Sequence, residues 1–291
     1  MTIPIYSRNC ELKTGMVFPD GMRRVCLCVE YNGSLFHGFQ AQRFAVETVQ
    51  KSLELALSSV ADEAITLVCA GRTDAGVHAC YQIVHFDTLA DRPLKAWSLG
   101  VNARLPQGVS VKWAQMVPSS FHARFGAVAR TYRYIIYNNP TRPALMREQV
   151  TWQKRPLNYQ AMVVAAASLV GEHDFSSFRA SQCQARSPVR HVRHLRFCRN
   201  RDLIVMEIKA NAFLHHMVRN IVGVLMTIGC GDKPTDWIQR VLLARDRTQG
   251  GVTGPAAGLY LVDVEYDSGF QLPPNPLGPY FLPEVLDWIS A

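Results

Sequence analysis

Two runs of alternating apolar residues stand on either side of a short segment with two glycines, and this arrangement constrains the fold most strongly. The runs cover residues 65–69 and 81–86, and their period of two is typical of strands. The ten residues 70–79 between them read AGRTDAGVHA. Their glycines allow a tight turn or a close approach by another molecule. We therefore predict two strands joined by a constrained loop.

This loop, residues 70–79, carries one carboxylate, Asp74, two residues after the guanidinium of Arg72. A neighbouring positive charge would favour the ionised form of the carboxylate. The plain alternative is that Asp74 is a turn residue that hydrogen-bonds its own backbone. The choice between these two interpretations depends on the rest of the chain.

Further periodic segments predict a mixed α and β protein. We expect strands at 24–31, 65–69, 81–86, 109–113, 127–137, 191–198, 203–208 and 259–264. We expect helices at 48–60, 93–101, 157–170, 213–228 and 235–243, with Thr48 and Thr235 as N-caps. The order repeats as two βαββα-like halves, which predicts an α+β fold with two sheets, helices on one face of each, and a cleft at the seam.

A chain of 291 residues can hold two such halves. The sequence divides into an N-terminal extension (1–22), an N-terminal α/β half with Asp74 (23–126), a C-terminal α/β half (127–267) and a C-terminal tail (268–291). The tail is rich in proline and glycine from Pro273 onward, which favours an extended end over a core element.

The formal net charge of +8 favours an anionic partner, and nucleic acid is the first candidate. One basic cluster comprises Arg179, Arg186, Arg190, Arg193, Arg196, Arg199 and Arg201. A smaller group, Arg124, Arg130 and Arg133, is interleaved with aromatic residues. Such interleaving suits RNA, which offers phosphates and stackable bases, although each cluster could also be a solvated strand face.

Eight cysteines are scattered without a C-x-x-C pair, so we expect free thiols and a reducing compartment. The N-terminus lacks the features of a signal peptide, and no apolar run approaches the ~18 residues of a membrane span. We therefore expect a cytoplasmic protein that does not contact membranes. His215 and His216 are neighbours on a predicted helix, where side chains diverge by about 100°, so we predict no metal site there.

Five sequence blocks, taken in order, resemble the tRNA pseudouridine synthase A family. They are residues 71–78 (GRTDAGVH), 130–138 (RTYRYIIYN), 173–178 (HDFSSF), 213–220 (FLHHMVRN) and 254–259 (GPAAGL). The resemblance runs from about residue 23 to residue 267 and leaves the two terminal segments outside.

The resemblance implies a pseudouridine synthase fold of two RRM-like or ferredoxin-like halves, whose antiparallel sheets meet at a central basic cleft. It implies an isomerase that converts uridine to pseudouridine at positions 38, 39 and 40 of the tRNA anticodon stem-loop. It also implies a homodimer that needs no cofactor or metal.

The resemblance assigns roles to single residues. Asp74 is the catalytic nucleophile, and whether it attacks C1′, attacks C6 or acts as a base stays open. Tyr132 is catalytic and stacks on the uracil, and Arg219 pairs with the catalytic carboxylate. Arg72 either pairs with Asp74 or fills the gap left by the flipped base, and Leu259 lines the uracil pocket.

Two other classes of protein compete with this interpretation. A non-catalytic RNA-binding protein of RRM-like architecture would explain the basic and aromatic residues, but a carboxylate facing RNA would only repel phosphate. The glycine and phenylalanine pattern of an RRM strand is also missing. A metal-dependent hydrolase would use the two histidines, and full activity in chelator would exclude it.

Overall fold

The computed structural model describes residues 18–42, 46–283 and 285–291. Most of the predicted N-terminal extension therefore lies outside the described residues. The strands are β1 (Arg23–Tyr31), β2 (Leu67–Cys69), β3 (His78–Thr88), β4 (Val109–Val117), β5 (Ala129–Asn138), β6 (Thr151–Gln153), β7 (Gly171–Asp174), β8 (Val189–Asn200), β9 (Leu203–Ala210), β10 (Leu259–Glu265) and β11 (Ile289–Ser290). The α-helices are α1 (Val49–Ala61), α2 (Tyr159–Ala166), α3 (Met217–Gly229) and α4 (Trp237–Ala244). The short helical turns are η1 (Gly33–Leu35), η2 (Ala96–Gly100), η3 (Ala167–Leu169), η4 (Ser176–Phe178), η5 (Arg247–Gln249) and η6 (Ser268–Phe270).

The predicted elements of the sequence are present, with shifted ends. The α1 helix illustrates why: Val49, Leu53 and Leu57 repeat at helical spacing and are buried. The Thr48 side chain accepts a hydrogen bond from the Lys51 amide and caps this helix as predicted. By contrast, α4 begins after Asp236 without a side-chain cap, so the predicted cap at Thr235 is wrong.

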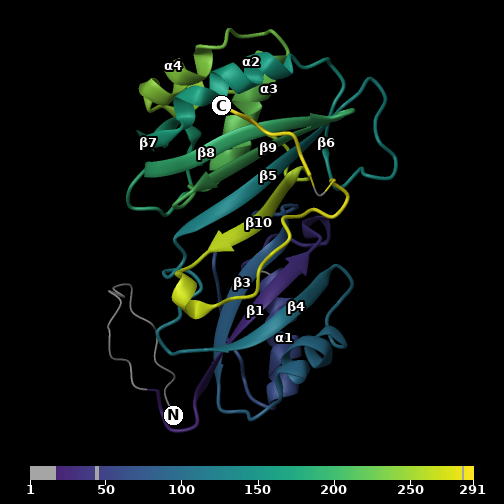
Figure 1. Ribbon diagram of the computed structural model, residues 1–291, viewed down its shortest axis with the longest axis vertical. Coiled ribbons are helices and arrows are strands. Elements are labelled where there is room, and N and C mark those ends of the chain that lie inside the picture. The colour runs from purple at the N-terminus through teal and green to yellow at the C-terminus, as the bar shows by residue number, and fades with distance from the viewer. Residues whose placement is uncertain (1–17, 43–45, 284) are drawn as a thin grey trace.

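The described strands form one continuous sheet with the order β11-β8-β9-β5-β10-β3-β1-β4 (Figure 1). The strands of the first half occupy one end and those of the second half the other. They join where β10 pairs with β3 in parallel, with Tyr260 opposite His78 and Leu261 opposite Ala79. All other strand pairs on this path are antiparallel. The prediction of two separate sheets is therefore wrong, because this junction merges them edge to edge.

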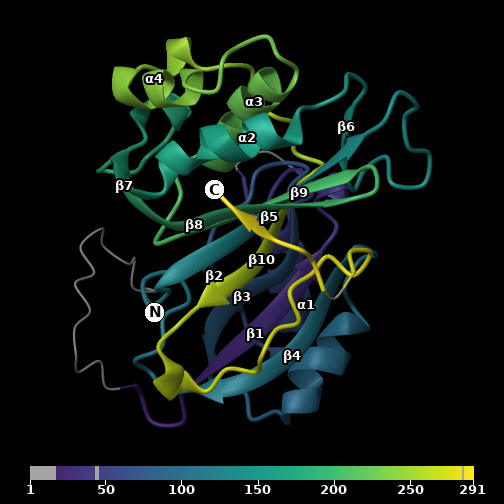
Figure 2. The same cartoon turned by 45° about the horizontal axis from the view of Figure 1, so that its top comes forward.

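Side-chain alternation along β10 separates two layers at the middle of the sheet. Leu259 and Leu261 belong to the main core, which also includes the buried faces of the helices. Tyr260 and Val262 point the other way and pack in a second apolar cluster with Leu282 of the tail. Helices α2, α3 and α4 gather over one end of the sheet and α1 over the other (Figure 2).

The C-terminal tail lies across the sheet on the side of the second cluster. It passes in front of β3 and β1 in Figure 1. The Tyr81 hydroxyl donates to the Pro273 carbonyl at 3.0 Å, and Arg133 donates to the carbonyls of Leu277 and Gly278. The tail ends in β11, which pairs with the edge strand β8. It is extended as predicted, but it covers core residues rather than standing free.

Three local features depart from the sequence prediction. The α3 helix begins at Met217 rather than at residue 213, because His216 adopts a left-handed backbone with φ 62°. The helix predicted at 93–101 contains the π-helical turn η2. The short strands β6, β7 and β11 were not predicted, since two to four residues are too few to show a period. Within the described residues, no helix has the length and apolar character needed to cross a membrane.

Candidate active site

The loop with Asp74 is held between the N-terminal half of the sheet and its neighbouring turns. Gln82 Nε2 donates to the Gly71 carbonyl at 2.6 Å. The Thr73 hydroxyl lies 2.7 Å from the Tyr31 hydroxyl, so one donates to the other. These contacts hold the segment just before Asp74, whose side chain is 22% exposed. A carboxylate held in this way can meet a ligand with little reorganisation.

Glycines let the loop approach other segments closely. A Cβ on Gly38 would stand 2.9 Å from the Thr73 carbonyl oxygen, and Gly38 has φ +92°. Gly76, at φ +77°, closes the turn after Asp74 and would bring a Cβ to 3.1 Å from Ala256 of the second half. The loop is therefore packed between both halves of the molecule.

Arg219 lies on the first turn of α3 and reaches Asp74 from the second half. Its Nη1 donates to Asp74 Oδ2 at 3.3 Å, and its Nε donates to the Gly254 carbonyl at 2.8 Å. The Gly254 amide in turn donates to the Arg219 carbonyl at 2.9 Å. The mutual arrangement orients the guanidinium toward the carboxylate, as the resemblance implied.

Two histidines that the sequence analysis set aside also reach Asp74. His215 Nε2 lies 3.2 Å from Oδ1, and His216 Nε2 lies 3.3 Å from Oδ2. Both residues precede the helix, so they do not diverge as helical neighbours would, and their ring centroids are 4.1 Å apart. Burial lowers the pKa of His216 more than the nearby Asp74 raises it.

The donor atoms of Asp74, His215 and His216 lie within 4.8 Å of one another, close enough to share a metal ion. The argument from helical divergence is thus wrong for this pair. However, the Arg219 guanidinium already contacts the same carboxylate oxygen as His216. A fixed positive charge at this position opposes a divalent cation. The arrangement therefore favours an Asp74 carboxylate held by the surrounding nitrogen groups over a bound metal ion.

Tyr132 projects from β5 on the face of the sheet that carries the main core. It packs edge to face with Phe213 at 5.0 Å between ring centroids. A Cβ on Gly71 would lie only 3.8 Å from its hydroxyl, so the hydroxyl stands over the Asp74 loop. Burial raises the pKa of Tyr132 more than the Arg130 charge lowers it, and Asp74 raises it further. The hydroxyl is therefore protonated at neutral pH.

Tyr132 is largely buried, with 8% of its surface exposed. Within the described residues, its hydroxyl has no hydrogen-bond partner. By contrast, the hydroxyl of its neighbour Tyr134 donates to the Pro255 carbonyl at 2.8 Å. The Tyr132 hydroxyl is also not among the fully buried polar atoms that lack a partner, so it keeps accessible surface and can be reached by a ligand.

The other two predicted site residues, Arg72 and Leu259, form no hydrogen bond or ion pair with Asp74 among the residues that the structure describes. Arg72 is exposed and forms no ion pair with Asp74, so the pairing that its sequence position suggested is wrong. Leu259 is buried on β10 opposite Tyr134, two residues before Leu261, which faces Tyr132. It lies on the same side of the sheet as Tyr132, within the main core.

Several arginines of the predicted basic clusters have internal partners. Arg133 and Arg196 both form ion pairs with Glu207, on the tail side of the sheet, and Arg193 pairs with Glu265. Successive side chains of a strand point to opposite faces of the sheet. Arg133 therefore points away from the face that carries its neighbour Tyr132. Arg133 and Arg196 therefore have internal charge partners and are not free phosphate-binding groups in this structure.

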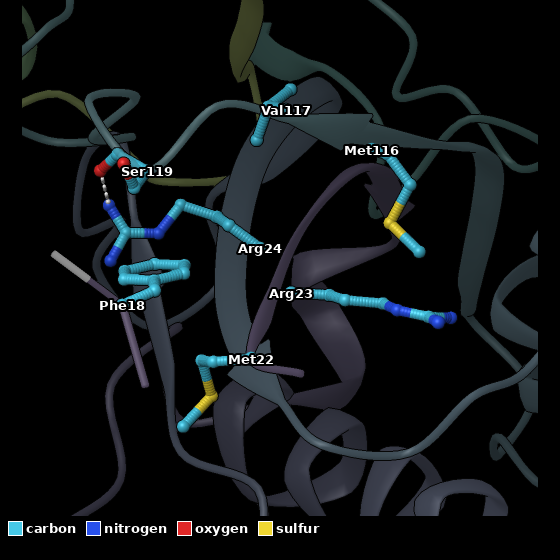
Figure 3. Close-up of a pocket in the computed structure, with 7 residues that line it drawn as sticks. All are labelled: Phe18, Met22, Arg23, Arg24, Met116, Val117 and Ser119. Carbon is cyan, nitrogen blue, oxygen red and sulfur yellow. Dashed lines mark hydrogen bonds between the residues drawn. The ribbon is translucent and has the colours of Figure 1, made fainter. Parts of the chain in front are cut away.

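A pocket of about 520 Å³ lies elsewhere, near the start of β1 and the end of β4 (Figure 3). It is lined by Phe18, Met22, Arg23, Arg24, Met116, Val117 and Ser119. Its buried guanidinium, Arg24, is committed to Asp87 and to the Ser119 carbonyl. The lining includes neither Asp74 nor Tyr132, so this pocket is separate from the Asp74 site.

The class of protein follows from comparison with known families. A family model described as tRNA pseudouridine synthase matches residues 27–126 and 165–267. The chain belongs to the tRNA pseudouridine synthase family, whose members are isomerases.

Curated relatives extend the match over nearly the whole chain. A tRNA pseudouridine synthase A from Pseudomonas aeruginosa is 57% identical over 270 residues, which cover 93% of this chain and 95% of the relative. A protein of the same name from Coxiella burnetii is 53% identical, covering 90% of this chain and all of the relative. Another from Cronobacter sakazakii is 54% identical, covering 89% and 96%.

Proposed function

We propose that this protein converts uridine to pseudouridine at positions 38, 39 and 40 of the tRNA anticodon stem-loop. One observation carries the proposal: the Asp74 carboxylate, paired with Arg219 at 3.3 Å, belongs to a loop over which the Tyr132 hydroxyl stands, since a Cβ on Gly71 would lie 3.8 Å from that hydroxyl. Family membership and the names of the relatives supply the reaction class and the tRNA substrate.

The reaction requires groups that this site offers. The C1′–N1 bond of the uridine breaks, the uracil turns, and a C1′–C5 bond forms. The proton on C5 leaves and N1 gains one, so no atom is added or lost. The base must leave the RNA stack to be reached, at a cost of a few kcal/mol. A carboxylate can attack the sugar or the base, or remove a proton, and Asp74 is the group we assign to this step.

Each half of the proposed two-domain division contributes to the site. The half at 23–126 supplies Asp74, and the half at 127–267 supplies Tyr132, Arg219 and Leu259. We assign Arg219 to holding Asp74 ionised and in place, because an opposite charge favours the charged form. Leu259 would form part of the apolar floor of the uracil pocket, and Arg72 would enter the space left by the flipped base.

Tyr132 would stack on the uracil and exchange a proton at C5. Its raised pKa means that the hydroxyl starts protonated, so it would relay a proton rather than act as a standing phenolate. The absence of an internal partner among the described residues leaves the hydroxyl free for this role.

We also propose a homodimer in which tRNA engages both subunits, and a cytoplasmic location. The described cysteines are all free thiols, which fits a reducing compartment. A non-catalytic RNA-binding protein is disfavoured because Asp74 would repel phosphate without benefit. Retained activity in chelator would separate the isomerase from a metal-dependent hydrolase.

The proposed target positions can be mapped directly. An unmodified tRNA with uridines at 38, 39 and 40 is incubated with the enzyme, and pseudouridine is then located by primer extension after carbodiimide treatment. We expect stops at these positions and at no other uridine of the anticodon arm. Pseudouridine confined to another arm of the tRNA would contradict the proposed specificity while leaving the reaction class intact.

A further inference from the structure

The loop between β4 and β5 presents an aromatic ring to solvent beside the site. Phe125 is 54% exposed, although it is a large apolar residue. Its ring packs on His122, with 4.6 Å between ring centroids and an interplanar angle of 32°. The Arg124 guanidinium lies 5.5 Å from the centroid of the same ring. The three side chains form a local stack, which we call the Phe125 platform.

Hydrogen bonds attach the platform to the Asp74 loop. Arg130 Nη2 donates to the Arg124 carbonyl at 2.7 Å and to the Ala70 carbonyl at 2.9 Å. Ala70 is the first residue of the segment that contains Asp74. The Ala123 amide donates to His85 Nδ1 at 3.1 Å, and this ring is buried in the sheet. The platform is thus anchored to the same elements that position Asp74.

Two guanidinium groups beside the platform have no carboxylate partner. Arg72 and Arg124 are both exposed, and neither forms an ion pair within the described part of the chain. Arg130 Nη2 binds the carbonyls of both Ala70 and Arg124, so the segment that leads into Arg72 lies beside Arg124. Partial burial lowers the pKa of Arg72, and the Arg124 charge lowers it further. Such an arrangement is stable when an anion such as a phosphate binds near both groups.

We propose that Phe125 is a stacking platform for an RNA base next to the target uridine, and that Arg124 binds the phosphate of that nucleotide. An aromatic face and an unpaired guanidinium side by side match the two chemical parts of one nucleotide. A base held here would occupy the space beside the Asp74 loop and limit which nucleotide can reach the carboxylate. The inference rests on the proposed function, because it places a further subsite at the same site.

Binding of a fluorescent RNA tests the platform. Anticodon stem-loop RNAs carry 2-aminopurine at the 5′ or 3′ neighbour of the target uridine, and binding is measured with the Asp74→Asn variant to prevent turnover. We expect quenching at one of the two neighbours, because an aromatic side chain stacks on that base. Adding Phe125→Ala should abolish the quenching and weaken binding by about 5- to 100-fold, whereas Phe125→Trp should retain both.

Three further variants control the interpretation. Phe125→Leu keeps an apolar side chain of similar size but has no aromatic ring. If stacking on the ring supplies the affinity, Phe125→Leu should bind the RNA as weakly as Phe125→Ala does. Tyr280→Ala removes another exposed aromatic residue, 62% exposed in the tail, and should bind as the parent does. Arg124→Gln should reduce the slope of log affinity against log salt concentration by about one, because one phosphate contact is lost. Phe125→Ala should leave this slope unchanged.

The outcomes separate this inference from the proposed function. Binding by Phe125→Ala within twofold of the parent, with quenching retained, would overturn the platform even if the wild-type enzyme makes pseudouridine. Failure of the wild-type enzyme to form pseudouridine in tRNA would overturn the proposed function itself, whatever the platform variants show.

Discussion

The Asp74 carboxylate is contacted by three nitrogen-bearing side chains from one short segment of the second half. His215 contacts Oδ1 of Asp74, while His216 and Arg219 contact Oδ2. Oδ2 therefore carries more of the anchoring, and Oδ1 is the oxygen with fewer neighbours. The left-handed backbone of His216 makes this convergence possible, because it turns the chain just before α3 begins.

The hydroxyl of Tyr132 should matter for turnover more than for binding. Tyr132→Phe removes the hydroxyl and keeps the stacking face, so we expect near-normal tRNA affinity and at least tenfold slower turnover, since a lost acid or base costs about 10²–10⁴-fold. Tyr132→Leu removes both and should also weaken binding. Single-turnover rates and binding by filter retention measure the two effects. Full activity of Tyr132→Phe would restrict this residue to stacking.

Among the elements, β5, β8 and β9 share a buried charge cluster on the tail side of the sheet. Glu207 on β9 is 1% exposed and accepts hydrogen bonds from Arg133, His194 and Arg196. Arg133 and Arg196 also pack on Trp288 of the tail, at 5.2 and 4.5 Å from the ring centroid. Glu207 therefore links the sheet to the tail through its cationic partners.

Removal of the Glu207 charge should destabilise the fold. Glu207→Gln leaves Arg133 buried without its counter-ion, which typically costs ~3–5 kcal/mol in unfolding free energy. Glu265→Gln, which removes partly exposed pairs with Lys209 and Arg193, should cost less, about 1 kcal/mol. Urea unfolding at pH 7 measures both, and equal small losses would contradict the assignment.

The same cluster predicts a dependence on pH. Burial alone would raise the pKa of Glu207, but hydrogen bonds from His194 and Arg133 outweigh it and bring the pKa to about 2, below the ordinary value of 4.5. The unfolded chain then binds the proton first as pH falls. The stability from Glu207 is therefore complete above pH 4.5 and is lost as pH falls toward 2. The difference between wild type and Glu207→Gln should shrink over this range.

Elements could be predicted from the sequence where a period is long enough to show. The strand β5 alternates, the strand β1 is an apolar run, and the helix α1 repeats at helical spacing; each spans nine or more residues, and their positions are confirmed. The start of α3 was missed because apolar residues continue the helical spacing before it. The left-handed turn at His216 could not be predicted from composition, because only a few per cent of non-glycine residues adopt a positive φ and most histidines do not.

At the scale of the whole molecule, the merger of the two halves could not be predicted. It depends on two residue pairs between β3 and β10, which lie far apart in the chain. The site was only partly foreseeable for the same reason. Asp74 is marked by its flanking glycines, but the internal partners of Arg133 and Arg196 depend on which face of a strand meets the tail. Sequence clusters of charge do not reveal those faces.

The continuous sheet also explains why the site is complete only in the intact chain. Asp74 belongs to the first half, and its nitrogen neighbours belong to the second. The parallel pairing of β3 with β10 holds the Asp74 loop next to β5, where Tyr132 lies. A change at this junction would therefore move the carboxylate relative to the tyrosine.

The role of Asp74 is tested most directly by tritium release from tRNA that carries uridine labelled at C5, since formation of the C1′–C5 bond expels that hydrogen. The wild-type enzyme should release tritium. Asp74→Asn should bind the tRNA within a few fold of wild type and release tritium at least ~10²-fold more slowly, because an amide keeps the shape but loses the nucleophile and base. Release by Asp74→Asn at more than about one per cent of the wild-type rate would contradict the assignment of Asp74 as the catalytic carboxylate.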